Sequence, residues 1–269
     1  MTTIVNNAPI EAFTFNGGEC HVSIAGIPIS ESTRITAYLY SAADIMQLMM
    51  VVDAIRRENT ETTIDLTIPY FPYGRQDRIC NQGEAFSLSV MAKMINSLEC
   101  NSVTVYDPHS PVTTDLLNNV IVISQAEILA SSSLMVDIQE KQLTLVSPDA
   151  GAENKTREVA KASGLDVIFC TKTRDATNGR ITATNIPEGV AGKPFIIIDD
   201  ICDGGRTFTE LAKALKNAGA GELYLYVTHG IFSKGLDVLK ENFQHVFCYH
   251  TFLDKDAVED DFLTILEDS

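Results

Sequence analysis

Short apolar runs alternate along the chain with longer segments whose apolar residues recur every three or four positions. The short runs are rich in β-branched and aromatic residues and predict strands, first as short strands within residues 10–30 and then at 35–40, 64–70 and 103–106. The longer segments predict helices at 41–55 and 86–98, with Ser41 as the N-terminal cap of the first. Because the connections are short, this strand, helix and strand order predicts parallel pairing with right-handed crossovers.

The same pattern starts again from about residue 120. Strands are predicted at 120–123, 143–146, 167–170, 195–198, 223–227 and 246–249. Helices are predicted near 126–138, 155–163 and 207–218, with a polar loop at 171–180 and a last helical turn around 262–266. The chain is therefore predicted to be an α/β protein of two domains, residues 1–122 and 123–269, each a mainly parallel sheet flanked by helices.

Composition and charge narrow the class of partner. The net charge of −16 argues against a nucleic acid or an anionic membrane as a partner. The six cysteines lack metal-ligand spacing, which favours reduced thiols. No segment reaches the roughly 18 apolar residues of a membrane span, and the N-terminus lacks the order of a signal peptide. We therefore expect a soluble, cytoplasmic protein.

The chemistry is concentrated where the predicted strands end. The buried run 195–198 stops at the acid pair Asp199 and Asp200, and a glycine-rich turn leads into the next helix. Adjacent carboxylates suit vicinal sugar hydroxyls, and the backbone amides at a helix N-terminus suit a phosphate. The lysine-containing signature of nucleotide triphosphatase loops is absent here. The alternative is an ordinary strand end, since any parallel strand can end in Asp and Gly.

Other strand ends carry complementary groups. The loop Tyr70-Phe-Pro-Tyr-Gly-Arg-Gln-Asp-Arg78 combines aromatic rings with two arginines, which suit a base and phosphate oxygens. The loops after the strands at 103–106 and 143–146 supply His109 and Asp149, which suit a magnesium ion completed by phosphates and water. Ligands of open parallel sheets bind beyond such strand ends. The alternatives are an arginine-rich surface loop and a structural histidine.

In their order along the chain, these motifs resemble those of ribose-phosphate pyrophosphokinases, which have the type I phosphoribosyltransferase fold. The resemblance extends from about residue 15 to 246 and implies ATP and Mg²⁺. It implies ATP binding by Phe15, Gly17, Glu19, Arg75, Gln76, Asp77 and Arg78, and metal binding by His109 and Asp149. It further implies a diphosphate loop at Asp149, Ala150 and Gly151, catalytic roles for Lys172 and Arg174, and acceptor binding by Asp199, Asp200, Asp203, Gly204, Gly205, Arg206 and Thr207.

The resemblance also implies an assembly. The turn Phe15-Asn-Gly-Gly-Glu19 is similar to a family turn that reaches the adenine bound by a neighbouring subunit, so a homo-oligomer, either a dimer or a hexamer, is expected. Gly17 stands where the family usually has Asp or Asn, which puts one base contact in question. A plain hairpin turn is the alternative. The loop at 79–84 lacks the basic residues common in the family, so regulation by phosphate or nucleotide is not carried over.

The acceptor turn departs most from the family. The usual Asp-Thr-Gly-Gly-Thr is here Asp203-Gly-Gly-Arg-Thr207, so Gly204 replaces a threonine and Arg206 replaces a glycine. A guanidinium suits a larger or more highly charged group, such as the diphosphate of ADP-ribose. The favoured alternative is that Arg206 faces solvent or pairs with Glu210, and that ribose 5-phosphate remains the acceptor.

The resemblance implies transfer of the diphosphoryl group of ATP to the anomeric hydroxyl of ribose 5-phosphate, a reaction of nucleotide biosynthesis. The same chemistry on ADP-ribose, with a role in NAD salvage, is the main alternative. A phosphoribosyltransferase is a lesser one, because it would not need the arginines of 70–78 or the pair Lys172 and Arg174. A non-catalytic regulatory relative would have lost Lys172, Arg174 or His109, and all three are present.

Overall fold

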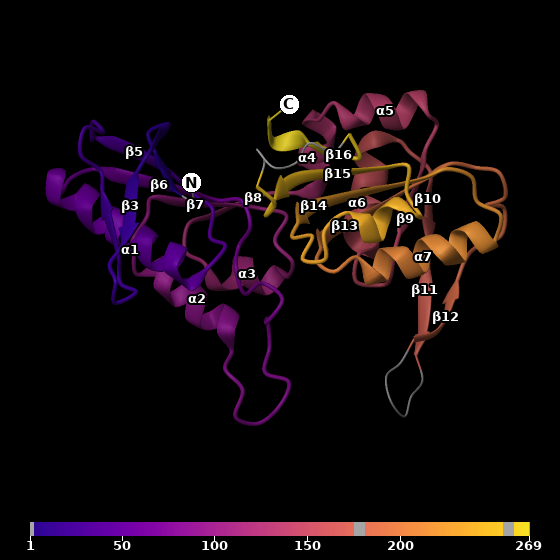
Figure 1. Cartoon of the computed structure of the whole chain (residues 1–269), viewed down its shortest axis with the longest axis horizontal. Helices are drawn as coiled ribbons and strands as arrows, with labels where there is room; N and C mark the ends of the chain where they lie inside the picture. Colours follow the sequence, from indigo (N-terminus) through magenta and orange to yellow (C-terminus); the bar gives the residue numbers. More distant parts are fainter. Residues whose placement is uncertain (1–2, 175–180, 255–260, 269) are drawn as a thin grey trace. The chain divides into compact units, whose positions relative to one another are not determined.

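The computed structural model describes residues 3–174, 181–254 and 261–268, although the side chains of 172–174, 181–184 and 268 lie outside the description. The chain divides into two compact units, residues 1–123 and 124–269 (Figure 1). Within the described residues, no helix has both the length and the apolar character that crossing a membrane requires.

The first unit is built on a six-stranded sheet in the order β2-β1-β5-β6-β7-β8. Its strands are β1 (Thr3–Val5), β2 (Ala8–Pro9), β5 (Ser32–Ala37), β6 (Thr63–Ile68), β7 (Ser102–Tyr106) and β8 (Val120–Ile123). Strands β5 to β8 pair in parallel, and β1 pairs antiparallel with β2 and β5. A separate hairpin consists of β3 (Glu11–Thr14) and β4 (Cys20–Ser23).

The core of the first unit lies on one face of this sheet. Helices α1 (Ala42–Glu58) and α2 (Ser87–Asn96) pack there, while α3 (Pro111–Leu116) follows β7. Figure 1 shows α1 and α2 on the same side of the strands. The strand residues alternate accordingly: Ile64 and Leu66 are buried, whereas Asp65 is partly exposed.

The second unit is built on a six-stranded parallel sheet in the order β10-β9-β13-β14-β15-β16. Its strands are β9 (Thr144–Ser147), β10 (Val167–Phe169), β13 (Phe195–Cys202), β14 (Leu223–Gly230), β15 (His245–Thr251) and β16 (Leu263–Ile265). The helices are α4 (Gln125–Ser131), α5 (Leu134–Glu140), α6 (Glu153–Ser163), α7 (Arg206–Asn217), α8 (Asp237–Lys240) and the 3₁₀ turn η2 (Leu266–Asp268). Strands β11 (Thr171–Arg174) and β12 (Ile181–Asn185) form a hairpin that projects from this unit (Figure 1).

Both faces of the second sheet are covered, because successive residues of its central strands point to opposite sides. Phe195 and Ile197 pack in one cluster with the apolar face of α7, and Ile196 and Ile198 pack in the other with residues of α4, α5 and α6. Strand β13 is therefore buried on both faces until its apolar run ends. The expected α/β class of mainly parallel sheets flanked by helices is confirmed.

Three local predictions are wrong. The helix near 126–138 is two helices, because Ser132 has an extended backbone and ends α4. Residues 171–174 form a strand rather than a loop, since they pair with β12; residues 175–180 of the predicted loop lie outside the described residues. Leu263 belongs to β16, which adds to the sheet beside β15, so only Leu266 of the predicted helical turn is helical.

The predicted cap of α1 is confirmed and can be tested. Ser41 accepts a hydrogen bond from the Asp44 backbone, and the Asp44 carboxylate accepts one from the Ser41 N–H at 2.7 Å. We predict that Ser41→Ala lowers the free energy of unfolding by about 1 kcal/mol. The control is Ser133→Ala, because Ser133 precedes α5 without a side-chain cap bond. Thermal unfolding of both variants checks this, and equal shifts would contradict it.

Candidate active site

The turn predicted to bind the acceptor, residues 203–207, follows the end of β13. The strand continues past its apolar run through Asp199 and Asp200 to Cys202, and helix α7 begins at Arg206. Gly205 precedes the helix with φ +74°, and a Cβ there would lie 3.1 Å from Leu239 Cδ2. A side chain at this position would therefore be unfavourable for two reasons, the left-handed backbone and the close contact with Leu239. Among the residues that the structure describes, no side chain caps the N-terminus of α7, so its first amides are open to an anion.

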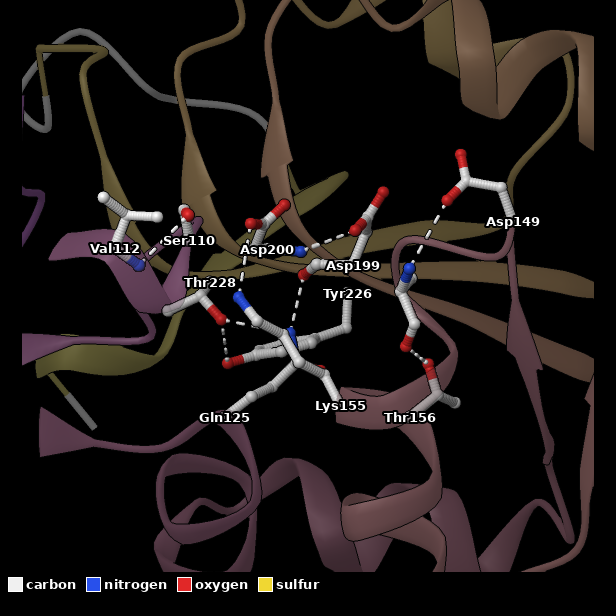
Figure 2. Close-up of polar contacts among 11 residues, drawn as sticks. Ser110, Val112, Gln125, Asp149, Lys155, Thr156, Asp199, Asp200, Tyr226 and Thr228 are labelled. Carbon is white, nitrogen blue, oxygen red and sulfur yellow. Dashed lines mark hydrogen bonds and ion pairs between the residues drawn. The ribbon is translucent and has the colours of Figure 1, made fainter. Parts of the chain in front are cut away.

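Side chains from two helices of the second unit contact the acid pair (Figure 2). Asp200 is buried, and its carboxylate lies 3.3 Å from the ammonium group of Lys155 on α6. The Asp200 N–H donates to Asp199 Oδ1 at 2.9 Å. Gln125 of α4 donates to the Asp199 carbonyl at 2.8 Å and to Thr228 Oγ1 of β14 at 3.3 Å. The two carboxylates therefore have fixed and different partners.

Burial raises the pKa of the Asp199 carboxyl well above its ordinary value, and the adjacent Asp200 charge raises it further. The N–H of Asp200 opposes this shift, while the charge of Asp149 adds to it. The end of the sheet therefore gathers the negative charge of three carboxylates. A bound cation or the hydroxyl donors of a sugar would relieve the repulsion among them.

The turn after β9 holds Asp149 by its own backbone. Its Oδ1 accepts hydrogen bonds from the N–H groups of Gly151 at 3.0 Å and Ala152 at 3.4 Å, and Ser147 Oγ donates to its carbonyl at 3.1 Å. The side chain thus occupies the amides that the sequence assigned to a diphosphate. Ala152 is buried with right-handed φ and ψ, which explains why this position does not need the family's second glycine.

In the first unit, the loop 70–78 lies against His109. These two segments follow the neighbouring strands β6 and β7, and a Cβ at Gly74 would lie 3.6 Å from His109 Cβ and 3.3 Å from the Phe71 carbonyl oxygen. A pocket of about 390 Å³ is lined by Arg75, Gln76, Asp77, Arg78, Cys80, Glu84, Ala85 and Ser87. The predicted ATP-binding residues of the loop therefore share one hollow beside the N-terminus of α2.

The hairpin of β3 and β4 presents an aromatic face. Phe13 and Phe15 are about half exposed and their ring centroids are 4.9 Å apart, with His21 5.3 Å from Phe13. The Phe15 N–H donates to the Glu19 carbonyl at 2.8 Å, which closes the predicted turn. The exposed Phe15 ring is thus available to a planar ligand.

The predicted metal ligands lie in different units, His109 in the first and Asp149 in the second. Over residues 3–174, 181–254 and 261–268, no three His, Cys, Asp or Glu residues are grouped to hold a metal ion. Asp149 nevertheless fits magnesium, which commonly binds one or two carboxylates and takes its other ligands from phosphates and water. The predicted catalytic residues Lys172 and Arg174 belong to β11, and their side chains lie outside the described residues.

Comparison with known proteins covers both units. Residues 113–251 match the model for the phosphoribosyl transferase domain, and residues 4–98 match the N-terminal domain of ribose phosphate pyrophosphokinase. The chain belongs to the ribose-phosphate pyrophosphokinase family. The solved phosphoribosylpyrophosphate synthetase of Mycobacterium smegmatis has the same fold, with a TM-score of 0.78 at 21% identity over 96% of this chain and 85% of that one.

Relatives within the pyrophosphokinase family are moderately similar. A ribose-phosphate pyrophosphokinase of Ralstonia nicotianae is 34% identical over 196 residues, which is 71% of this chain and 60% of that protein. That of Thermococcus kodakarensis is 28% identical over 84% of this chain and 79% of that protein. Against the Ralstonia relative and those of Ureaplasma parvum and Cereibacter sphaeroides, the chain spans 60%, 57% and 56% of their length.

Sequence reasoning missed two residues that shape this pyrophosphokinase-family site. Lys155 and Gln125 hold the acid pair, yet they lie 45 and 74 residues from their partners in the chain. The signal for Lys155 was a lysine on the helix that directly follows the turn of Asp149. Gln125 gave no signal, because a glutamine at the start of a helix has no special chemistry until the fold places it.

We predict that Lys155→Met lowers the free energy of unfolding by about 1 to 3 kcal/mol, because it leaves a buried carboxylate without its cation. Lys161→Met, on the exposed side of the same helix, is the matched control and should change little. Adding Asp200→Asn to Lys155→Met should recover most of the loss. Chemical denaturation of the three variants measures this, and equal losses for Lys155→Met and Lys161→Met would refute the pairing.

Asp199 should also make stability depend on pH. The pKa of Asp199 in the folded protein lies above the ordinary value of 3.8. Below pH 3.8 the carboxyl is protonated in both the folded and the unfolded state, so it does not lower stability. As the pH rises from 3.8 through the folded pKa, ionising the buried group lowers the free energy of unfolding. Asp199→Asn should therefore gain stability over the wild type as pH increases from about 4, measured by denaturation in a metal chelator.

Asp65 provides the opposite control for that measurement. Hydrogen bonds from Ser102 and Asn101 lower the pKa of its carboxyl. Its contribution is present above pH 3.8 and is lost as pH falls through the folded value, so the deficit of Asp65→Asn should shrink in acid. Parallel pH profiles for the two variants would contradict both assignments.

Proposed function

We propose that the protein transfers the diphosphoryl group of ATP to the anomeric hydroxyl of a ribose 5-phosphate unit, giving phosphoribosyl pyrophosphate and AMP. The observation that carries this proposal is that one chain of the pyrophosphokinase family contains both an arginine-lined pocket at 75–78 and an acid pair beside an uncapped helix N-terminus. The first suits the donor nucleotide and the second suits the acceptor sugar.

The acceptor binds at the end of β13. Asp199 and Asp200 accept hydrogen bonds from the ribose hydroxyls, and the first amides of α7 hold the 5-phosphate. The fixed partners of the acid pair support this role, because they orient both carboxylates before the sugar arrives. Ordering the acceptor in advance lowers the entropic cost of bringing its hydroxyl to the phosphorus.

The donor binds in the first unit. Arg75 and Gln76 hold the phosphates and sugar of ATP, while Phe15 from another copy of the chain stacks on the adenine. The exposure of Phe15 supports this arrangement. It requires a homo-oligomer, whose size could be measured by light scattering.

In the reaction, the anomeric oxygen forms a bond to the β-phosphorus of ATP and loses its proton, while the bond from that phosphorus to the bridging α,β-oxygen breaks and AMP leaves. Such transfer depends mainly on positioning and charge stabilisation. Lys172 and Arg174 neutralise charge on the moving group. His109 and Asp149 would hold Mg²⁺, which neutralises phosphate charge when it is bound.

The decisive experiment incubates the protein with ATP, Mg²⁺ and ribose 5-phosphate and identifies products by mass spectrometry. Phosphoribosyl pyrophosphate and AMP in equal amounts would support the proposal. A phosphoribosyltransferase would instead consume phosphoribosyl pyrophosphate with a base and release pyrophosphate. Asp199→Asn is the control for activity from a contaminant, because it should lose most of the turnover.

We predict that the double variant Lys172→Ala and Arg174→Ala lowers kcat by about two to three orders of magnitude, the range for removing a charge-stabilising donor. Lys213→Ala, on an exposed position of α7, is the control and should keep full activity. Initial rates at saturating substrates check this. Comparable activity of the double variant and the wild type would overturn the catalytic assignment.

A further inference from the structure

A segment after β14 folds back onto the acceptor turn. Ser233 Oγ donates to Asp203 Oδ1 at 2.5 Å, and the Ser233 N–H donates to the Asp203 carbonyl at 3.1 Å. The N–H groups of Ile231 and Phe232 donate to the Cys202 carbonyl at 2.8 and 3.0 Å. These hydrogen bonds hold the backbone of the next residue, Lys234, beside the turn.

The lysine stem lies directly against Gly204. A Cβ at Gly204 would be 3.5 Å from Lys234 Cγ and 3.9 Å from Ser233 Oγ. The turn therefore lacks the hydroxyl donor of the threonine that is usual at this position, and the stem of a cationic side chain lies beside it.

The charge of Lys234 is available to a ligand. The residue is exposed, and among the described parts of the chain its ammonium group has no hydrogen bond or ion pair. Among the carboxylates of this region, Asp200 pairs with Lys155 and Asp203 accepts a hydrogen bond from Ser233.

Arg206 supplies a second cation at the start of α7. Its Nε lies 2.7 Å from Glu210 Oε1, which is the contact expected from the sequence, but the arginine side chain is 88% exposed and the glutamate 43%. Such an exposed pair is screened by water and contributes little stability. A phosphate could therefore take the guanidinium from Glu210 at small cost, and a planar guanidinium binds phosphate oxygens by two hydrogen bonds.

We propose that Lys234 and Arg206 form a second phosphate subsite beside the acceptor turn, so that the acceptor is a ribose carrying a 5-diphosphate group, as in ADP-ribose. This rests on the proposed function. The amides of α7 hold the phosphate nearest the sugar, and the two cations hold the outer one. Ribose 5-phosphate is the same acceptor without the outer phosphate and is used less well.

The test compares kcat/KM for ribose 5-phosphate, ribose 5-diphosphate and ADP-ribose, with AMP release as the readout. The two diphosphates should be preferred in the wild type. Lys234→Gly and Arg206→Gly should each lower kcat/KM for the diphosphates about tenfold or more, the effect of losing one charge-assisted hydrogen bond, and should change that for ribose 5-phosphate much less. Lys213→Ala is the matched control and should leave the preference unchanged.

The outcomes separate this inference from the proposed function. Turnover of ribose 5-phosphate without turnover of either diphosphate would overturn the subsite and leave the function standing. A preference for diphosphates that survives in both variants would overturn the assignment of Lys234 and Arg206.

If no acceptor releases AMP, the proposed function fails, and calorimetry then tests the subsite alone. Ribose 5-diphosphate is the probe because it lacks the adenine that could enter a nucleotide site. Tighter binding than ribose 5-phosphate, lost in the double variant Lys234→Gly and Arg206→Gly, would support the subsite. Equal binding of the two sugars would refute it.

Discussion

The pairing of Lys155 with Asp200 is the contact on which the end of β13 in the second unit depends. The apolar run of β13 is followed within the strand by two adjacent carboxylates, and taking such charges out of water is unfavourable unless each has a partner. Lys155 balances the more buried carboxylate, and the backbone N–H of Asp200 binds the other. The central strand of the sheet can therefore carry two adjacent acids.

The pattern of apolar residues predicted the fold class because buried residues recur every three or four positions in a helix and lie in short apolar or alternating runs in a strand. Its limits lie where tertiary contacts override local preference. Strand β13 runs to Cys202 rather than Ile198, because Asp199 and Ile201 pair with Val227 and His229 of β14 in the parallel ladder. The opposite error occurred at Ser132, where one serine interrupts a helical pattern that is otherwise continuous.

For the candidate site, the loops at strand ends could be predicted and their partners could not. Sequence position identifies a residue at the end of a strand, since parallel strands end at one edge. It does not identify which distant side chain faces it. Gln125, Lys155 and Lys234 were missed for this reason, whereas the contact of Arg206 with Glu210 could be foreseen because four residues on a helix make one turn.

The turn after β9 has a consequence for how tightly any anion can bind there. The Asp149 carboxylate occupies the place that an anionic ligand could take, because it already accepts hydrogen bonds from the amides of Gly151 and Ala152. An incoming anion would exchange one set of hydrogen bonds for another, so the count of bonds would change little. The affinity of this turn for an anion would then depend on a cation bound together with that anion. The Asp149 carboxylate, released from the amides, would be free to bind that cation.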